Sequence, residues 1–102
     1  MTKHIFDFEQ IKTYDDFYRL AMLELDLPDY FGNNLDALWD SVTGYIELPV
    51  DIEFINLSLS QLDEFEELLL LFEDAAMDLE EDVFFEFSLR KEDQELLMND
   101  ED

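Results

Sequence analysis

The chain has 102 residues, which is enough for one domain with a single core but not for two. Its 29 Asp and Glu outnumber its 5 Lys and Arg, and the formal net charge of -24 argues against direct binding to nucleic acid or anionic membranes, whose phosphates would repel it. Hydrophobic residues make up 48% of the chain, so we expect a folded core, and the absence of Cys excludes disulfides, thiol catalysis and thiolate metal sites.

The first expected elements are a strand over residues 4–8 and a helix that begins after Thr13. The strand segment is aromatic and β-branched and ends at a polar turn. Thr13 is the expected N-cap, and Asp16, three residues later, would complete a shortened capping box. Pro28 ends the segment. The apolar positions with helical spacing are Tyr14, Phe17, Tyr18, Ala21 and Leu25.

The stretch 28–44 holds one of the two Pro and both Gly, so the backbone is steered most strongly here. Asn34 can cap a second helix, and Gly44 is placed to end it. Asp36 and Asp40 would lie one above the other on one helix face, where like charges repel. Asp36 gains from the helix dipole in the first turn, whereas Asp40 lies toward the wrong end. The position of Asp40 therefore points to a role other than stability.

The second half predicts a strand, a long helix and a last strand. Residues 50–54 alternate apolar with acidic side chains, which indicates a strand with one face toward water. Residues 62–79 carry apolar side chains in steps of three and four, typical of an amphipathic helix, with a break near its start left open. Residues 83–89 predict the last strand, and the polar residues after it a frayed tail, helical or not.

This order of elements predicts an α/β fold, because helical crossovers join parallel strands. We expect a three-stranded parallel sheet packed against three to four helices. The domain would span residues 1–89, followed by an acidic C-terminal tail over 90–102. No secretory segment follows Met1 and no apolar run approaches the roughly 18 residues of a membrane span, so we expect a cytoplasmic protein.

The chain offers few groups for catalysis or for metal binding. It has one His, His4, and no glycine-rich phosphate loop or calcium-binding loop, so we expect neither an enzyme nor a cofactor or metal site. Most acids in the second half are expected to form a solvated helix face. A different pattern, acids mixed with aromatics as in interface anchors, is formed by Asp36, Asp40 and Glu47 with Tyr30, Trp39 and Tyr45. Trp39 fits the helix core equally well.

Residues 27–40, followed by Thr43-Gly44-Tyr45 and Glu47-Leu48-Pro49, closely resemble the signature of the barstar family, intracellular inhibitors of the bacterial ribonuclease barnase. The resemblance implies a three-stranded parallel sheet covered by helices. It also implies a contact surface with Asp40 as central anchor, to which the later long helix adds Asp74 and Asp78. The other implied contact residues are Tyr30, Asn34, Leu35, Asp36, Trp39, Gly44, Tyr45 and Glu47.

The chain departs from the family's founding member at three of these positions, where Tyr45 replaces Trp and the acids at 74 and 78 are Asp instead of Glu. The reach of these side chains, and the choice of partner, would differ from those of the founding member. The resemblance also implies a cis Leu48–Pro49 bond, although the sequence alone favours trans.

The function implied is inhibition of a basic ribonuclease, barnase-like or a related toxin nuclease, by an acidic surface that mimics RNA phosphates. The free protein would be a monomer that binds neither nucleic acid nor membranes. The alternative left open is an acidic immunity protein or nucleic-acid mimic that binds a different nuclease or a DNA-binding protein.

Overall fold

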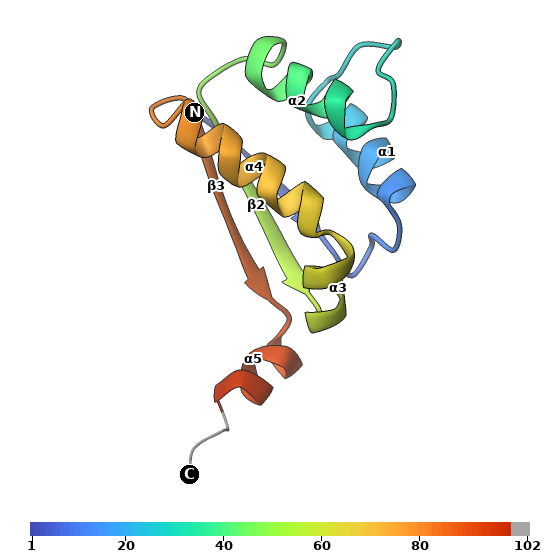
Figure 1. Ribbon diagram of the computed structural model, residues 1–102, viewed down its shortest axis with the longest axis vertical. Helices are drawn as coiled ribbons and strands as arrows, with labels where there is room; N and C mark the ends of the chain where they lie inside the picture. The colour runs from blue at the N-terminus through green and yellow to red at the C-terminus, as the bar shows by residue number, and fades with distance from the viewer. Residues whose placement is uncertain (99–102) are drawn as a thin grey trace.

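The computed structural model describes residues 1–98, and side chains for residues 1–95. Along the chain (Figure 1) it contains the strands β1 (Thr2–Asp7), β2 (Val50–Leu57) and β3 (Val83–Leu89), and the helices α1 (Tyr14–Glu24), α2 (Leu35–Gly44), α3 (Leu59–Glu64), α4 (Glu66–Asp78) and α5 (Lys91–Met98). The end of the expected tail, residues 99–102, lies outside the described residues. Within the described part, no helix combines the length and the hydropathy needed to cross a bilayer.

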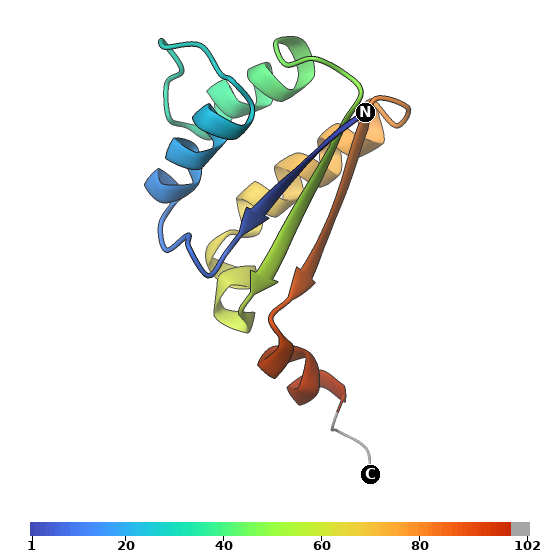
Figure 2. The same ribbon diagram turned by 180° about the vertical axis from the view of Figure 1, so that it is seen from behind.

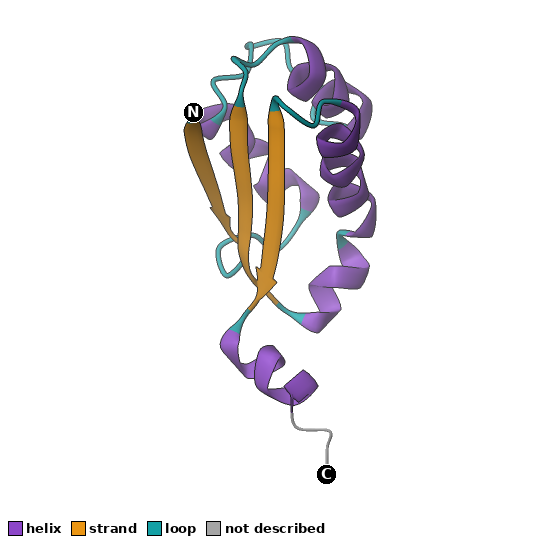
Figure 3. Cartoon of the chain, turned by 90° about the vertical axis from the view of Figure 1, so that its left-hand side faces the viewer, coloured by secondary structure: helices purple, strands orange, loops and turns teal. Residues whose placement is uncertain are grey.

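The three strands form one parallel sheet in the order β1-β2-β3, with β2 at the centre. Because the order advances in one direction and such crossovers share one hand, both connections place their helices on the same face of the sheet. Figures 2 and 3 show helices along that face and the other face left bare. The expected α/β fold with a three-stranded parallel sheet is confirmed.

Strand β2 carries the predicted alternation between a buried and a water-facing side. Ile52 and Phe54 are fully buried under the helices, whereas Asp51 and Glu53 are half-buried on the open face. Lys3, from the neighbouring strand, lies there with its Nζ 3.1 Å from Glu53 Oε1 and 3.8 Å from Asp51 Oδ2. The hydrogen bond to Glu53 raises the pKa of this amine above its ordinary value. This ion pairing offsets part of the charge repulsion across the open face.

The core between sheet and helices is built mainly of phenylalanine. Phe54, at the middle of the sheet, is fully buried, and five other rings have centroids 4.8–5.7 Å from its own. These rings belong to Phe6, Phe8, Phe17, Phe72 and Phe85. Together with Phe54 they come from all three strands, the β1–α1 connection, α1 and α4, so one cluster holds the layers together.

Two helix starts follow the sequence prediction. Thr13 Oγ1 accepts the backbone N–H of Asp16 at 3.1 Å, and Asp16 Oδ2 accepts the N–H of Thr13 at 3.2 Å, which completes the capping box of α1. A further hydrogen bond from the backbone N–H of Lys12 is the main reason why the pKa of Asp16 is lowered. Asn34 caps α2, as predicted.

The helix expected over residues 62–79 is divided near its start, at the break that the sequence left open. Ser58 begins α3 with a capping box that the prediction missed, and α4 starts after Phe65. Phe65 leaves helical geometry, with φ -107° and ψ 25°, and its ring is buried against those of Phe8 and Tyr14. The chain bends here because this ring must reach the core.

Smaller differences concern the ends of elements. β1 starts at Thr2 and β2 continues to Leu57, beyond their predicted limits, while β3 agrees. Helix α2 ends at Gly44 as expected, but Gly44 does not adopt the left-handed conformation of a glycine cap. Its φ is not positive, and the cap residue is Tyr45. The Leu48–Pro49 bond is cis, as the resemblance implies and contrary to the general preference for trans.

The described part of the expected tail is helix α5, which is tied to the start of α3. Asp93 is almost fully buried, and its Oδ2 accepts the backbone N–H of Leu59 at 2.8 Å and Nε of Arg90 at 3.0 Å. The backbone N–H of Arg90 in turn donates to the carbonyl of Leu57. The N–H groups in the first turn of a helix have no partner within that helix, and Asp93 supplies one for the N–H of Leu59.

Candidate functional site

The loop before α2 is shaped by two residues in the left-handed region, Asp26 and Asn33, both with φ 53°. Asp26 follows the end of α1, and the N–H of Leu27 donates back to the carbonyl of Met22 at 3.1 Å, a Schellman closure that the sequence prediction missed because no Gly marks it. The chain then crosses to α2, which begins directly after the second left-handed turn.

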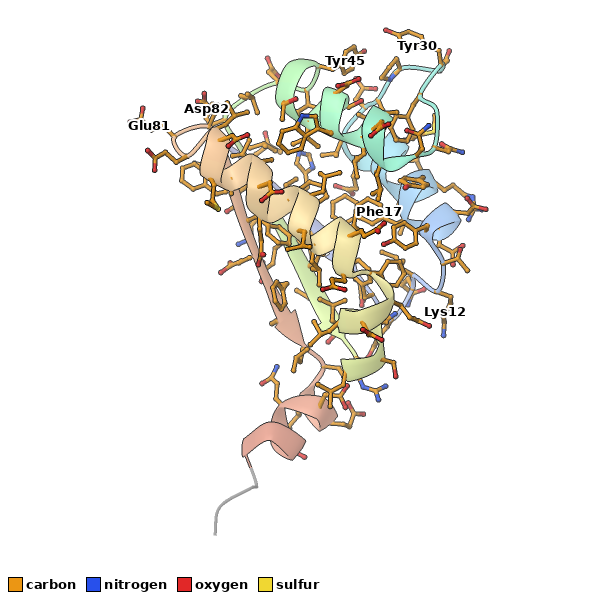
Figure 4. The ribbon with its side chains drawn as sticks, viewed as in Figure 1. Lys12, Phe17, Tyr30, Tyr45, Glu81 and Asp82 are labelled. Carbon is orange, nitrogen blue, oxygen red and sulfur yellow. The ribbon has the colours of Figure 1, made fainter. Side chains whose placement is uncertain are left out.

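One residue of this loop is anchored and its neighbour is not. The ring of Phe31 is buried, with its centroid 5.8 Å from that of Tyr18 in α1. Tyr30, in contrast, is 83% exposed. Because the anchored neighbour fixes the backbone, the Tyr30 side chain is presented to solvent from a defined position, as Figure 4 shows.

Helix α2 is held in place by its cap and by its apolar face. Asn34 Oδ1 accepts the N–H of Ala37 at 2.8 Å, and Asn34 Nδ2 donates to the carbonyl of Gly32 at 3.2 Å. A Cβ at Gly32 would come within 3.1 Å of that Nδ2, so the close turn favours glycine. Leu38 and Val42 are fully buried beneath the helix. Asn34 therefore has a structural role besides any contact it makes.

The opposite side of α2 presents its two predicted acids. Asp36 and Asp40 are both exposed. Within the part of the chain that the structure describes, neither has an ion-pair partner. The last turn of α2 contains no basic residue that could offset Asp40. The repulsion between the two carboxylates, and the unfavourable interaction of Asp40 with the helix dipole, are therefore left uncompensated in the free protein.

A hollow of about 220 Å³ brings together three of the predicted site residues, Tyr30, Asp40 and Tyr45. Tyr45 is 52% exposed and lies at the same end of the molecule as Tyr30 (Figure 4). The remaining lining residues are Pro28, Phe31, Gly32, Ala37 and Ser41. The hollow thus combines one unpaired carboxylate with two tyrosines, a set that can accept hydrogen bonds from a cation and pack against a flat side chain.

The other predicted residues of the 28–49 segment have different surroundings. Leu35 and Trp39 are half-buried and pack on the core, so the core interpretation of Trp39 is confirmed, with part of its side chain left accessible. Gly44 is exposed, and nothing lies within 4 Å of the Cβ that it lacks. Glu47 is exposed in the α2–β2 connection and lines, with Tyr45, a second cleft of about 550 Å³.

Two predicted acids lie on another helix. Asp74 and Asp78 are exposed on α4, which packs against α2. No Lys or Arg occurs between Leu20 and Leu89, so the segment that contains α2 and α4 carries acids alone. The field at this end of the molecule is strongly negative, which favours a basic partner over a nucleic acid.

Two comparisons with known proteins identify the family of the chain. The family model described as "Barstar (barnase inhibitor)" matches residues 1–90. A protein of Bacillus subtilis (strain 168) named "Putative ribonuclease inhibitor YrdF" is 44% identical over 54 residues. That alignment covers 53% of this chain and 56% of the relative, little more than half of each. Because the family match extends over nearly the whole described structure, the chain belongs to the barstar family.

Proposed function

We propose that the chain is a cytoplasmic inhibitor of a basic ribonuclease, which it blocks by placing the α2 surface in the enzyme's active site. The observation that carries the proposal is the hollow in which an exposed carboxylate, Asp40, lies beside two exposed tyrosines. Membership in the barstar family and the printed name of the Bacillus subtilis relative support the same activity.

The physical mechanism is occupancy of a phosphate site. A ribonuclease binds phosphodiesters with Arg, Lys and protonated His, and a carboxylate on a rigid helix can accept charge-assisted hydrogen bonds from the same donors. Asp40 is held by a helix whose cap and apolar face are both fixed, so little entropy is lost when it binds. Tyr30 and Tyr45 would exclude water around the ion pairs, which strengthens them.

The negative field contributes mainly to the rate of association. With no cation between residues 20 and 89, the approach of a basic enzyme toward α2 is attractive at long range. Association should exceed the roughly 10⁵–10⁶ M⁻¹s⁻¹ of uncharged pairs and fall steeply with salt. The free protein would be a monomer, because copies with a charge of -24 repel one another.

The experiment is a titration of barnase, and of other basic microbial ribonucleases, with the purified protein. We expect loss of RNA cleavage at a 1:1 ratio, and a nucleotide bound in the enzyme's active site should compete with the inhibitor. Full activity of every such enzyme at excess protein would refute the proposal.

The alternative of a nucleic-acid mimic is distinguished by mapping. A mimic of the DNA backbone would spread its binding energy over the acids of α3 and α4, whereas an active-site plug concentrates it around Asp40. Charge-neutralising variants at exposed Asp63, Glu64 and Glu67 should therefore weaken inhibition only slightly. Losses at these positions equal to those at Asp40 would favour the mimic.

A further inference from the structure

Tyr45 lines a second cleft besides the Asp40 hollow. It measures about 550 Å³ and is formed by the start of β1, the end of α1 and the α2–β2 connection. Figures 1 and 2 both show the N-terminus beside that connection. Tyr45 lines both spaces, so the cleft continues the surface assigned above to the nuclease.

The polar groups of this cleft come from separate segments. Glu24 is the last residue of α1, Asp26 lies in the left-handed turn after it, and Glu47 lies in the α2–β2 connection. His4, from β1, is the one side chain with a basic nitrogen in the lining, and its Nδ1 lies 3.1 Å from Glu24 Oε1. The lining therefore holds three carboxylates and no Lys or Arg, and the amino group of Met1 and the ring of His4 are its only basic groups, so acids remain in excess.

The dimensions and chemistry of the cleft fit a large planar cation. Within the described residues, no three His or carboxylate groups converge closely enough to hold a metal ion, which argues against a small cation. The exposed ring of Tyr45 offers a face on which a guanidinium can stack, while the carboxylates on the other walls accept its N–H groups. An amine could use the carboxylates but would gain less from the ring.

We infer that this cleft receives an arginine side chain of the target nuclease, so that the inhibitor engages its enzyme through both spaces that Tyr45 lines, with Glu24 and Asp26 as contact residues. The inference rests on the proposed function, and it extends the contact surface to the end of α1. These two acids are contributed by a segment outside the 28–49 stretch that carries the other aromatic and acidic contacts.

The first test compares two pairs of substitutions in binding to barnase. Glu24→Gln with Asp26→Asn removes two charges from the cleft while keeping an acceptor for His4 and a residue that tolerates positive φ. Glu80→Gln with Glu81→Gln removes the same charge from exposed residues that do not line the cleft, and Glu81 lies at the same end of the molecule as Tyr45 (Figure 4). We expect the cleft pair to weaken binding about tenfold or more, mainly through faster dissociation, and the control pair less than about threefold.

The second test needs no nuclease and uses arginine amide as the probe. Titration into the ¹⁵N-labelled protein should shift the amide signals of Glu24, Asp26 and Tyr45 to saturation, and the cleft pair should abolish these shifts. Shifts scattered over all acidic surfaces, or equal effects of both pairs on nuclease binding, would overturn the inference. If barnase is not inhibited but the local shifts appear, the proposed target fails while the arginine cleft stands.

Discussion

Asp40→Ala tests the proposed anchor directly, because the substitution should hardly change the stability of the free protein. The side chain is exposed and has no ion pair among the described residues, so its removal leaves no cavity and no unsatisfied partner. Substitutions at such positions usually change stability by no more than about 0.5 kcal/mol. Removing a negative charge from a helix without a basic last turn should, if anything, stabilise it by a few tenths of a kcal/mol.

In the complex the same change should be costly. Asp40 would be enclosed between Tyr30 and Tyr45, and its loss would leave cationic groups of the enzyme buried without a partner. Central anchors of this kind cost about 2 kcal/mol or more when truncated, which corresponds to at least about a 30-fold loss of affinity. Glu66→Ala, which removes an exposed acid from the first turn of α4, is the matched control and should cost less than about 1 kcal/mol.

The assay is inhibition of RNA cleavage together with thermal unfolding, for Asp40→Ala, Asp40→Asn and Glu66→Ala. Weak inhibition with an unchanged or slightly raised melting temperature for both Asp40 variants is the expected pattern. Equal and small losses of inhibition at Asp40 and Glu66 would contradict the anchor. A marked fall in melting temperature for Asp40→Asn would assign this residue a structural role instead.

Three further predictions concern stability. Because hydrogen bonds lower the pKa of Asp16 below 3.8, its carboxylate stabilises the fold above that pH and loses this effect as the pH falls through the folded-state pKa. Asp16→Asn should therefore be less stable than wild type at pH 7, with the difference in unfolding free energy closing below pH 3.8 in urea unfolding; a difference that is the same at both pH values would contradict this role. Asp93→Ala should lower the free energy of unfolding by about 1–3 kcal/mol, because it leaves the N–H of Leu59 without its partner. An unchanged melting temperature would show that α5 is not attached to the start of α3. Asp26→Gly should raise the melting temperature and Asp26→Ala lower it, because φ is 53° there, and the reverse order in a thermal scan would contradict the left-handed turn.

Much of the local structure could be predicted because it depends on neighbours in the chain. Thr13 and Asn34 cap helices through hydrogen bonds that span three residues, so their roles are visible in the sequence. The alternation that predicts β2, and the acids on the solvent side of α2, also follow from local periodicity. At these positions pattern and structure agree, whereas the equally local capping box at Ser58 and left-handed turn at Asp26 were not predicted.

The bend at Phe65 depends on contacts between distant parts of the chain, which a local pattern does not predict. The steps of three and four continue across it, so the pattern alone leaves a break open and does not place it at Phe65. The ring turns into the core because Phe8 and Tyr14, some 50 residues earlier, supply its contacts at 5.2 and 5.0 Å. Asp93 is similar, since its polar sequence context predicts a frayed tail, and its burial depends on Leu59.

The class of fold, the helix that bears the acids and the negative charge of the chain follow from the sequence alone, because they depend on composition, on periodicity and on caps that span few residues. Only the tertiary structure decided which of those residues share a surface. The hollow of Tyr30, Asp40 and Tyr45 and the cleft with Glu24 and Asp26 exist because two left-handed turns and the packing of α1 and α2 on the sheet bring separate segments together. Such contacts arise from packing between distant elements, which no local pattern records.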